Sequence, residues 1–150
     1  MDIYQKCLTI KYKIALITVL ALLLYCKNTP NVNSPLSNTG IKVTAPSGGS
    51  TFFIGDSIKI TWGLDTTVSG LVFEFTPNNG RSFFIIGEVL TTSSAYLNKE
   101  YSWTIPDSVT NNGSLIVSTI SDSCKIWAHD YFNYSIGALS EKTFSIRKKP

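Results

Sequence analysis

Apolar and polar residues alternate along most of the chain after Ile41, in short segments separated by turn residues. Successive side chains of a β-strand point to opposite faces, so an alternation of period two predicts strands with one buried face. No stretch of this region shows the 3.6-residue period of an amphipathic helix. The pattern predicts an all-β domain of seven to eight strands. The expected strands lie at 41–46, 57–62, 70–77, 81–89, 100–106, 114–120, 123–130 and 142–147.

Two details of the pattern sharpen this expectation. The segments 70–77 and 81–89 flank Asn78-Asn79-Gly80, which is typical of the tight turn of a β-hairpin. The spacing of the strands over about 107 residues is typical of an immunoglobulin-like β-sandwich, in which two sheets bury alternate residues between them. Large apolar residues from separate strands are then expected to point inward, and four of them test the prediction: Trp62, Phe73, Trp103 and Ile126.

The first 40 residues follow a different pattern. Three lysines, Lys6, Lys11 and Lys13, precede the uncharged run 14–25, which ends at Cys26. A helix of that length reaches only about 18 Å, well short of a hydrocarbon core of roughly 30 Å. The run is therefore predicted to belong to a signal peptide rather than a membrane span. Residues 27–40 are rich in Asn, Ser, Thr and Pro, which predicts a flexible tether.

The end of the uncharged run, Leu23-Leu24-Tyr25-Cys26, resembles the lipobox of bacterial lipoproteins. In that motif the cysteine receives a diacylglycerol thioether and becomes the new N-terminus, although Gly, Ala or Ser is preferred where Tyr25 stands. The resemblance implies lipid attachment at Cys26. The alternative is an uncleaved N-terminal anchor, and either arrangement holds the domain at a membrane. The expected order is a signal peptide 1–25, a tether 26–40, the sandwich 41–147 and a basic tail 148–150.

Removal of the signal peptide changes the charge and the cysteine content. The chain has 13 basic and 10 acidic residues, and residues 1–25 contain three lysines and one aspartate, so 10 basic and 9 acidic residues remain. A nearly neutral domain has no electrostatic reason to bind nucleic acid. With Cys7 removed and Cys26 lipidated, Cys124 is left alone, and no intrachain disulfide is expected.

Catalytic chemistry has little support in the sequence. A hydrolase needs convergent carboxylates or a nucleophile with its base, whereas the acidic residues are dispersed one per strand or turn. His129 is the only histidine, and its neighbour Asp130 would point to the opposite face of a strand. The aspartates lack an EF-hand or a His/Cys spacing. We therefore predict no enzyme, cofactor or metal, with a turn-bound calcium left open, and a buried, inert thiol at Cys124.

Short motifs in the domain resemble a known family. They are PSGG at 46–49, FFIGD at 52–56, ITW at 60–62 and YSWTIP at 101–106. They resemble the Ig-like module of the fungal cell-wall glucan-synthesis (Kre/Knh) N-terminal family and of the Ser-Thr-rich GPI-anchored membrane family. Many bacterial surface proteins share this module. The resemblance implies an Ig-like fold and a surface or wall-associated role. It brings no catalytic residues to this chain.

The strand 123–130 indicates where a ligand binds. If Ile126 and Ala128 face the core, the period of two points Trp127 and His129 outward. Exposed aromatic groups beside polar neighbours stack on sugar rings or anchor protein partners. The alternative is that a loop folds over Trp127 and buries it in a second small core. The candidate ligand-binding residues are Trp127, His129, Tyr131, Phe132 and Tyr134.

These patterns together predict a non-catalytic envelope lipoprotein with one Ig-like domain, acting as a binding or structural module at the cell surface or in the periplasm. The expected partners are the membrane, through the lipid on Cys26, and a cell-wall polysaccharide or an envelope protein. A second hypothesis is a carbohydrate-associated wall module that uses the exposed aromatic face, and a hydrolase is the third and least supported. The ligand and the oligomeric state are left open.

Overall fold

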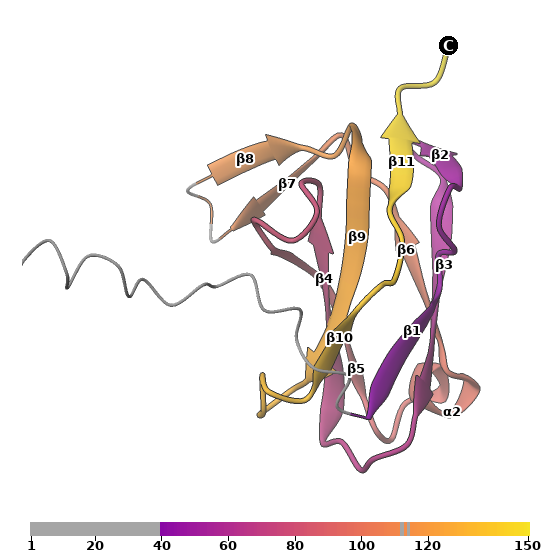
Figure 1. The fold of residues 1–150 in the computed structure, drawn as a ribbon, viewed down its shortest axis with the longest axis vertical. Coiled ribbons are helices and arrows are strands. Elements are labelled where there is room, and N and C mark those ends of the chain that lie inside the picture. Colours follow the sequence, from indigo (N-terminus) through magenta and orange to yellow (C-terminus); the bar gives the residue numbers. More distant parts are fainter. Residues whose placement is uncertain (1–39, 112, 114) are drawn as a thin grey trace, which may run out of the picture. The chain divides into compact units, whose positions relative to one another are not determined.

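The computed structural model describes residues 40–111, 113 and 115–150, and the predicted signal peptide and all but the last residue of the predicted tether lie outside them. The described part forms two facing β-sheets, which confirms the predicted all-β, Ig-like sandwich (Figure 1). Its elements are β1 (Ile41–Ala45), β2 (Thr51–Phe53), β3 (Ser57–Leu64), β4 (Gly70–Thr76), β5 (Phe84–Leu90), α2 (Ser94–Asn98), β6 (Glu100–Thr104), β7 (Ser108–Asn111), β8 (Leu115–Ser118), β9 (Ser121–Asp130), β10 (Gly137–Leu139) and β11 (Phe144–Arg147).

The two sheets differ in size. The smaller sheet has the order β1-β3-β6 and is antiparallel throughout. The larger sheet has the order β2-β11-β9-β4-β5, and the long strand β9 pairs with β4 along one edge and with both β11 and β10 along the other. This is the division of strands expected of an immunoglobulin-like sandwich. β7 and β8 form a separate hairpin (Figure 1).

The predicted strands are all present, with ends that differ by a few residues. The prediction missed β2, β7 and β10, which have three or four residues each, and the five-residue helix α2. Three residues are too few to show a period, which explains the omission of β2 and β10. β8 and β11 are as short as β7, but they were predicted as parts of longer segments. Among the residues described, no helix combines the length and the hydropathy needed to cross a membrane.

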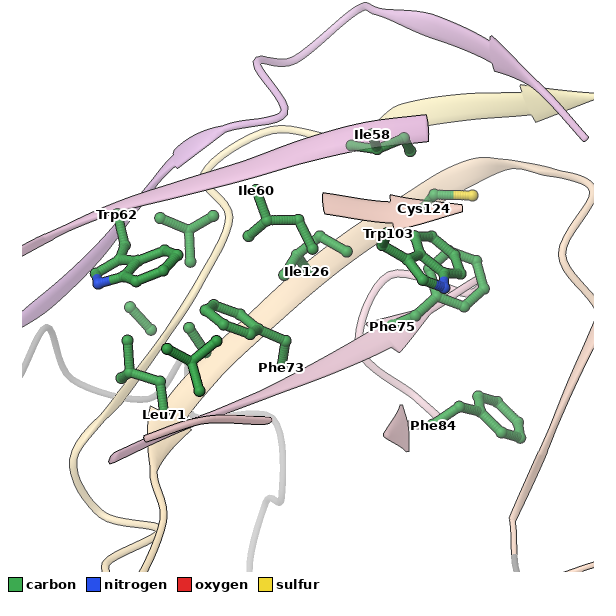
Figure 2. Packing of buried hydrophobic residues seen from close by; sticks show 14 of the residues in the cluster. Ile58, Ile60, Trp62, Leu71, Phe73, Phe75, Phe84, Trp103, Cys124 and Ile126 are labelled. Carbon is green, nitrogen blue, oxygen red and sulfur yellow. The ribbon is translucent and has the colours of Figure 1, made fainter. Parts of the chain in front are cut away.

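The core lies between the sheets and consists of the predicted inward residues. Trp62, Phe73, Trp103 and Ile126 are at most 7% exposed, so the alternation predicted their orientation correctly. Aromatic rings of the smaller sheet pack on rings of the larger one: Trp62 lies 5.0 Å from Phe73, and Trp103 lies 5.1 Å from Phe75, between ring centroids (Figure 2). Burying such a side chain contributes about 1.5–3 kcal/mol, so this face is the main source of stability.

Tyr101 on β6 links the smaller sheet to the edge of the larger one. Its ring stacks on Phe73 with a centroid distance of 5.4 Å, and its hydroxyl donates a hydrogen bond of 2.8 Å to the Ile86 carbonyl. Burial raises the pKa of the Tyr101 phenol. Gly87 makes the contact possible, because a Cβ at that position would lie 2.2 Å from the Tyr101 hydroxyl oxygen.

The predicted hairpin between β4 and β5 is confirmed by the antiparallel pairing of these strands. Asn79 and Gly80 at the turn have φ angles of 56° and 91°, in the left-handed region that Asn and Gly adopt most readily. The side-chain carbonyl of Asn78 accepts hydrogen bonds from the backbone N–H groups of Arg81 and Ser82 at 3.0 and 2.9 Å. The turn residues therefore set the register of the hairpin.

Candidate functional site

The outer face of the larger sheet, which points away from the sandwich core, carries polar and aromatic side chains from β4 and β9. The strand register places Val72 opposite His129 and Glu74 opposite Trp127. All four are buried, with exposed fractions of 5%, 1%, 6% and 6% in that order. The expectation that Trp127 and His129 are exposed is therefore wrong, and the alternative of a cover over Trp127 is correct.

The cover is the segment 131–136, here called the aromatic loop, which connects β9 to β10. The Tyr134 ring stacks on His129 with a centroid distance of 4.0 Å and an interplanar angle of 29°, and it contacts Trp127 edge-on at 5.2 Å. The Tyr134 hydroxyl donates a hydrogen bond of 3.3 Å to the carboxylate of Glu74. From the β4–β5 turn, Phe83 packs on Trp127 at 5.0 Å. We call Glu74, Phe83, Trp127, His129 and Tyr134 the outer cluster.

β10 completes the cover, and it does so through a glycine. Gly137 pairs with His129, and a Cβ at position 137 would lie 2.8 Å from Nε1 of Trp127 and 2.9 Å from Cβ of His129. Contacts below 3.0 Å are too close for a real Cβ atom. The close approach of β10 to the outer cluster therefore requires glycine at this position.

The outer cluster contains buried polar atoms whose hydrogen bonding is incomplete. Nδ1 of His129 lies 2.8 Å from the Asp130 carbonyl, and because a carbonyl only accepts, this nitrogen carries the proton. Nε2 of His129 lies 3.8 Å from Glu74 Oε1, beyond hydrogen-bond distance. Among the residues that the structure describes, neither this atom nor Nε1 of Trp127 has a hydrogen-bond partner. Burial, with the nearby Glu74 charge, raises the pKa of the Tyr134 phenol.

Asp130 fixes the aromatic loop in place. One carboxylate oxygen accepts hydrogen bonds from the backbone and hydroxyl of Ser69, and the other accepts from the backbone N–H groups of Phe132 and Asn133 at 3.0 and 2.8 Å. Burial raises the pKa of the Asp130 carboxyl, but these hydrogen bonds lower it by more, so the net pKa lies below its usual value. The carboxylate therefore stays ionised and clamps the loop to the β3–β4 connection.

The aromatic loop leaves three rings in contact with solvent. Tyr131, Phe132 and Tyr134 are 38%, 82% and 54% exposed, and the rings of Tyr131 and Phe132 pack edge-on at 5.0 Å. The five predicted ligand-binding residues are thus neighbours in space but fall into two groups. Trp127 and His129 lie beneath Tyr134, whereas Tyr131 and Phe132 project beyond the sheet.

Sequence reasoning missed Glu74, Phe83 and Gly137, which complete the site. The alternation of the segment 70–77 places Glu74 on the face opposite to Phe73, but nothing local indicates that a loop 60 residues later supplies its hydrogen-bond donor. Of these three residues, Gly137 is the one that the sequence could have indicated, because glycine within a strand often marks a close approach of another group.

The groups best suited to catalysis are placed where they cannot reach a substrate in solution. Cys124 is fully buried on the inner face, and burial raises the pKa of its thiol to about 11, so the neutral form dominates. This confirms the predicted inert thiol. His129 lies under Tyr134 on the outer face. Within residues 40–150, leaving aside 112 and 114, no three His, Cys, Asp or Glu side chains group as metal ligands.

Comparisons with known proteins add a structural likeness. No family model matches the chain, and no curated protein matches it. Among solved structures, the chain is similar to one described as "Structures of Clostridium thermocellum CbhA fibronectin(III)-like modules", with 12% sequence identity, coverage of 73% of this chain and 98% of that chain, and a TM-score of 0.39.

Proposed function

We propose that this protein is a non-catalytic module of the cell envelope, held at a membrane by lipid on Cys26, and that it contacts its partner through the exposed part of the aromatic loop. The observation that carries the proposal is the combination of exposure and fixed conformation in that loop. Phe132 is 82% exposed, yet its backbone is bound by the carboxylate of Asp130. Binding residues are typically found on loops that a rigid scaffold positions.

The chemistry of the loop supports a contact role. Aromatic side chains provide a large contact area and lose little conformational entropy on binding, since few bonds rotate. Two backbone N–H groups of the loop are bound by the Asp130 carboxylate, which Ser69 holds in place through two further hydrogen bonds. The loop therefore loses little further freedom when a partner binds. The burial of Cys124 and His129, the residues most suited to nucleophilic or acid–base chemistry, supports the non-catalytic part of the proposal.

The lipid anchor is supported by the resemblance of residues 23–26 to a lipobox. Growth of cells with a palmitate analogue tests it directly. We expect label on the wild-type chain and no label on Cys26→Ser. Cys7→Ser and Cys124→Ser are matched controls that keep the label, because each removes a cysteine outside the motif. Label that survives in Cys26→Ser would refute the anchor.

The contact role is tested with Phe132→Ala and a control of similar exposure away from the loop. Ile116 on β8 is 74% exposed, so Ile116→Ala removes a comparable apolar surface. Cosedimentation with isolated wall polysaccharide and with envelope vesicles measures binding of the purified protein. We expect Phe132→Ala to weaken binding about tenfold, as for a contact worth more than 1 kcal/mol, and Ile116→Ala to bind normally. Equal binding by both variants would show that the loop is not part of the contact surface.

A carbohydrate-associated wall module is the second candidate, and the position of Tyr134 favours it. One face of this ring is stacked on His129, and the side chain is still 54% exposed, so the opposite ring face is open to solvent. A flat, fixed aromatic face is what a sugar ring stacks on. Under this hypothesis Tyr134→Phe retains polysaccharide binding and Tyr134→Ala loses it. Loss of binding in both variants would show that the hydroxyl, rather than stacking, is required.

A further inference from the structure

We propose that the tip of the aromatic loop inserts into the surface of the bilayer that carries the lipid anchor. Here the tip means Tyr131 and Phe132 of the loop together with the adjacent Leu90 at the end of β5; Leu90, Tyr131 and Phe132 are 58%, 38% and 82% exposed. The inference rests on the proposed anchor at Cys26 and names the partner of the exposed loop: a lipid surface.

The three side chains of the tip lie together at one end of the larger sheet. Leu90 at the end of β5 pairs with Gly70, and the Tyr131 backbone donates a hydrogen bond of 3.2 Å to the Gly70 carbonyl. A Cβ added to Gly70 would lie 3.5 Å from Cβ of Tyr131 and 3.9 Å from Cα of Leu90. Leu90 and Tyr131 therefore flank a position without a side chain, and Phe132 extends the apolar surface by packing on Tyr131.

The three side chains of the tip are uncharged, and exposed carboxylates near this end of the sandwich belong to Glu88 on β5 and Asp65 in the β3–β4 connection. The aromatic loop reads YFNYSI from 131 to 136 and contains no ionisable acid or base apart from its tyrosines. The neighbouring Asp130 is 4% exposed, and both of its oxygens accept hydrogen bonds from within the domain. Phenylalanine and leucine enter the acyl boundary, while tyrosine places its ring at the headgroup level, where one end is apolar and the other is wet.

The chain enters the domain at the same end as the tip. The Gly40 carbonyl accepts a hydrogen bond of 2.9 Å from Asp65 in the β3–β4 connection. The other end of that connection, Ser69, is hydrogen bonded to Asp130 at the base of the aromatic loop. These two contacts, joined by the short β3–β4 connection, place the start of β1 at the same end as the loop, and both lie at the lower end of the sandwich in Figure 1.

The length of the connecting segment permits either end of the domain to face the bilayer, and the end with the tip needs the least extension of the segment. Whatever conformation they adopt, residues 27–40 span at most about 50 Å. β9 has ten residues, so the domain is roughly 33 Å long in the strand direction. The end with the tip reaches the bilayer without using this length, whereas the opposite end would require most of it. The anchor also converts a weak apolar contact into an intramolecular one with a high effective concentration.

Tryptophan placed at the tip reports insertion. The three native tryptophans are at most 7% exposed, so a new exposed tryptophan is observed against a steady background. Phe132→Trp tests the tip, and Ile116→Trp on the β7–β8 hairpin at the opposite end is the matched control (Figure 1). Each lipidated full-length protein is reconstituted into phosphatidylethanolamine–phosphatidylglycerol vesicles with and without brominated acyl chains, and the vesicles are floated. Circular dichroism confirms that both variants fold.

The expected result is a blue shift and a loss of the added emission in brominated vesicles for Phe132→Trp, with neither change for Ile116→Trp. Protein that floats but shows equal, unquenched emission from both variants overturns the insertion and leaves the anchor intact. Protein that does not float overturns the anchor, and the insertion with it. If soluble wall polysaccharide shifts the Phe132→Trp emission while brominated vesicles do not, the tip binds sugar and the lipid assignment is wrong.

Discussion

The two faces of β4 are equally buried but for different reasons. On the inner face Leu71, Phe73 and Phe75 are each 0% exposed beneath the smaller sheet. On the outer face Val72 and Glu74 are 5% and 6% exposed, under the side chains of β9 and the aromatic loop. A sheet covers its partner along whole strands, whereas a loop covers through a few contacts. The inner face therefore supplies stability, and the outer face is where a change can alter the surface without unfolding the domain.

The two faces also differ in the polarity of their buried side chains. The inner cluster consists of hydrophobic residues whose aromatic rings pack across the sheets, and among the residues described the ring nitrogen of Trp62 lies buried there without a hydrogen-bond partner. The outer cluster combines rings with the Glu74 carboxylate and, within the described part of the chain, has two such nitrogens, one each in Trp127 and His129. Unpaired buried polar atoms reduce the stability gained from burial. Substitutions on the two faces are therefore expected to differ in cost.

The largest effect is expected on the inner face. Phe73→Ala removes a fully buried ring that packs on both Trp62 and Tyr101. We expect the free energy of unfolding to fall by about 3–5 kcal/mol, because the cavity is enclosed by two sheets and closes poorly. Urea unfolding followed by circular dichroism measures the loss. A cost below about 1 kcal/mol would show that the inner face is not the principal core.

On the outer face, Trp127→Ala is expected to cost about 3 kcal/mol, at the lower end of the range for large aromatic residues. The substitution also removes an unpaired nitrogen, and the aromatic loop is able to settle into part of the space. The same urea unfolding experiment measures this loss in parallel with that of Phe73→Ala. A loss larger than that of Phe73→Ala would reverse the ranking of the two faces.

Gly137→Ala tests the close approach of β10 with one methyl group. The added Cβ would overlap Trp127 and His129, so we expect a loss of about 1–3 kcal/mol through overpacking and a shift in tryptophan emission. Gly63→Ala is the matched control, because a Cβ at this strand position meets no atom within 4 Å. Equal stability of the two variants would mean that β10 moves away without cost.

The smallest effect is expected for Asp130→Asn, and it depends on pH. The folded state lowers the pKa of Asp130 relative to about 3.9 for an unfolded chain. This group therefore stabilises the fold above pH 4, and that contribution is lost as the pH falls through the folded pKa. Asp130→Asn should lose stability at pH 7 and show a shallower further decline on acidification than the wild type.

Asp107→Asn, at an exposed position, controls for the change in net charge in this comparison. Thermal unfolding from pH 7 to 3 provides the measurement. Parallel acid profiles for Asp130→Asn and the wild type would show that the loop is held by other contacts.

Much of the sandwich was predictable because its determinants are local. Period-two alternation predicted the inward orientation of Trp62 and Trp103, and Asn79-Gly80 predicted the hairpin turn. The alternation also predicted correctly that Trp127 points away from the core. It was wrong about exposure, since alternation specifies the face of a sheet and contains no information on what lies above that face.

By itself, the sequence determined an all-β domain and which side chains of its strands point inward. Each follows from the spacing of residue types over ten or fewer positions. Only the tertiary structure decided that Tyr134 covers His129 and donates a hydrogen bond to Glu74, 60 residues away. The tertiary structure also decided that β10 packs closely beside Trp127, which the absence of a side chain at Gly137 allows. These contacts join distant segments through side-chain packing, which depends on three-dimensional fit rather than on any repeating pattern along the chain.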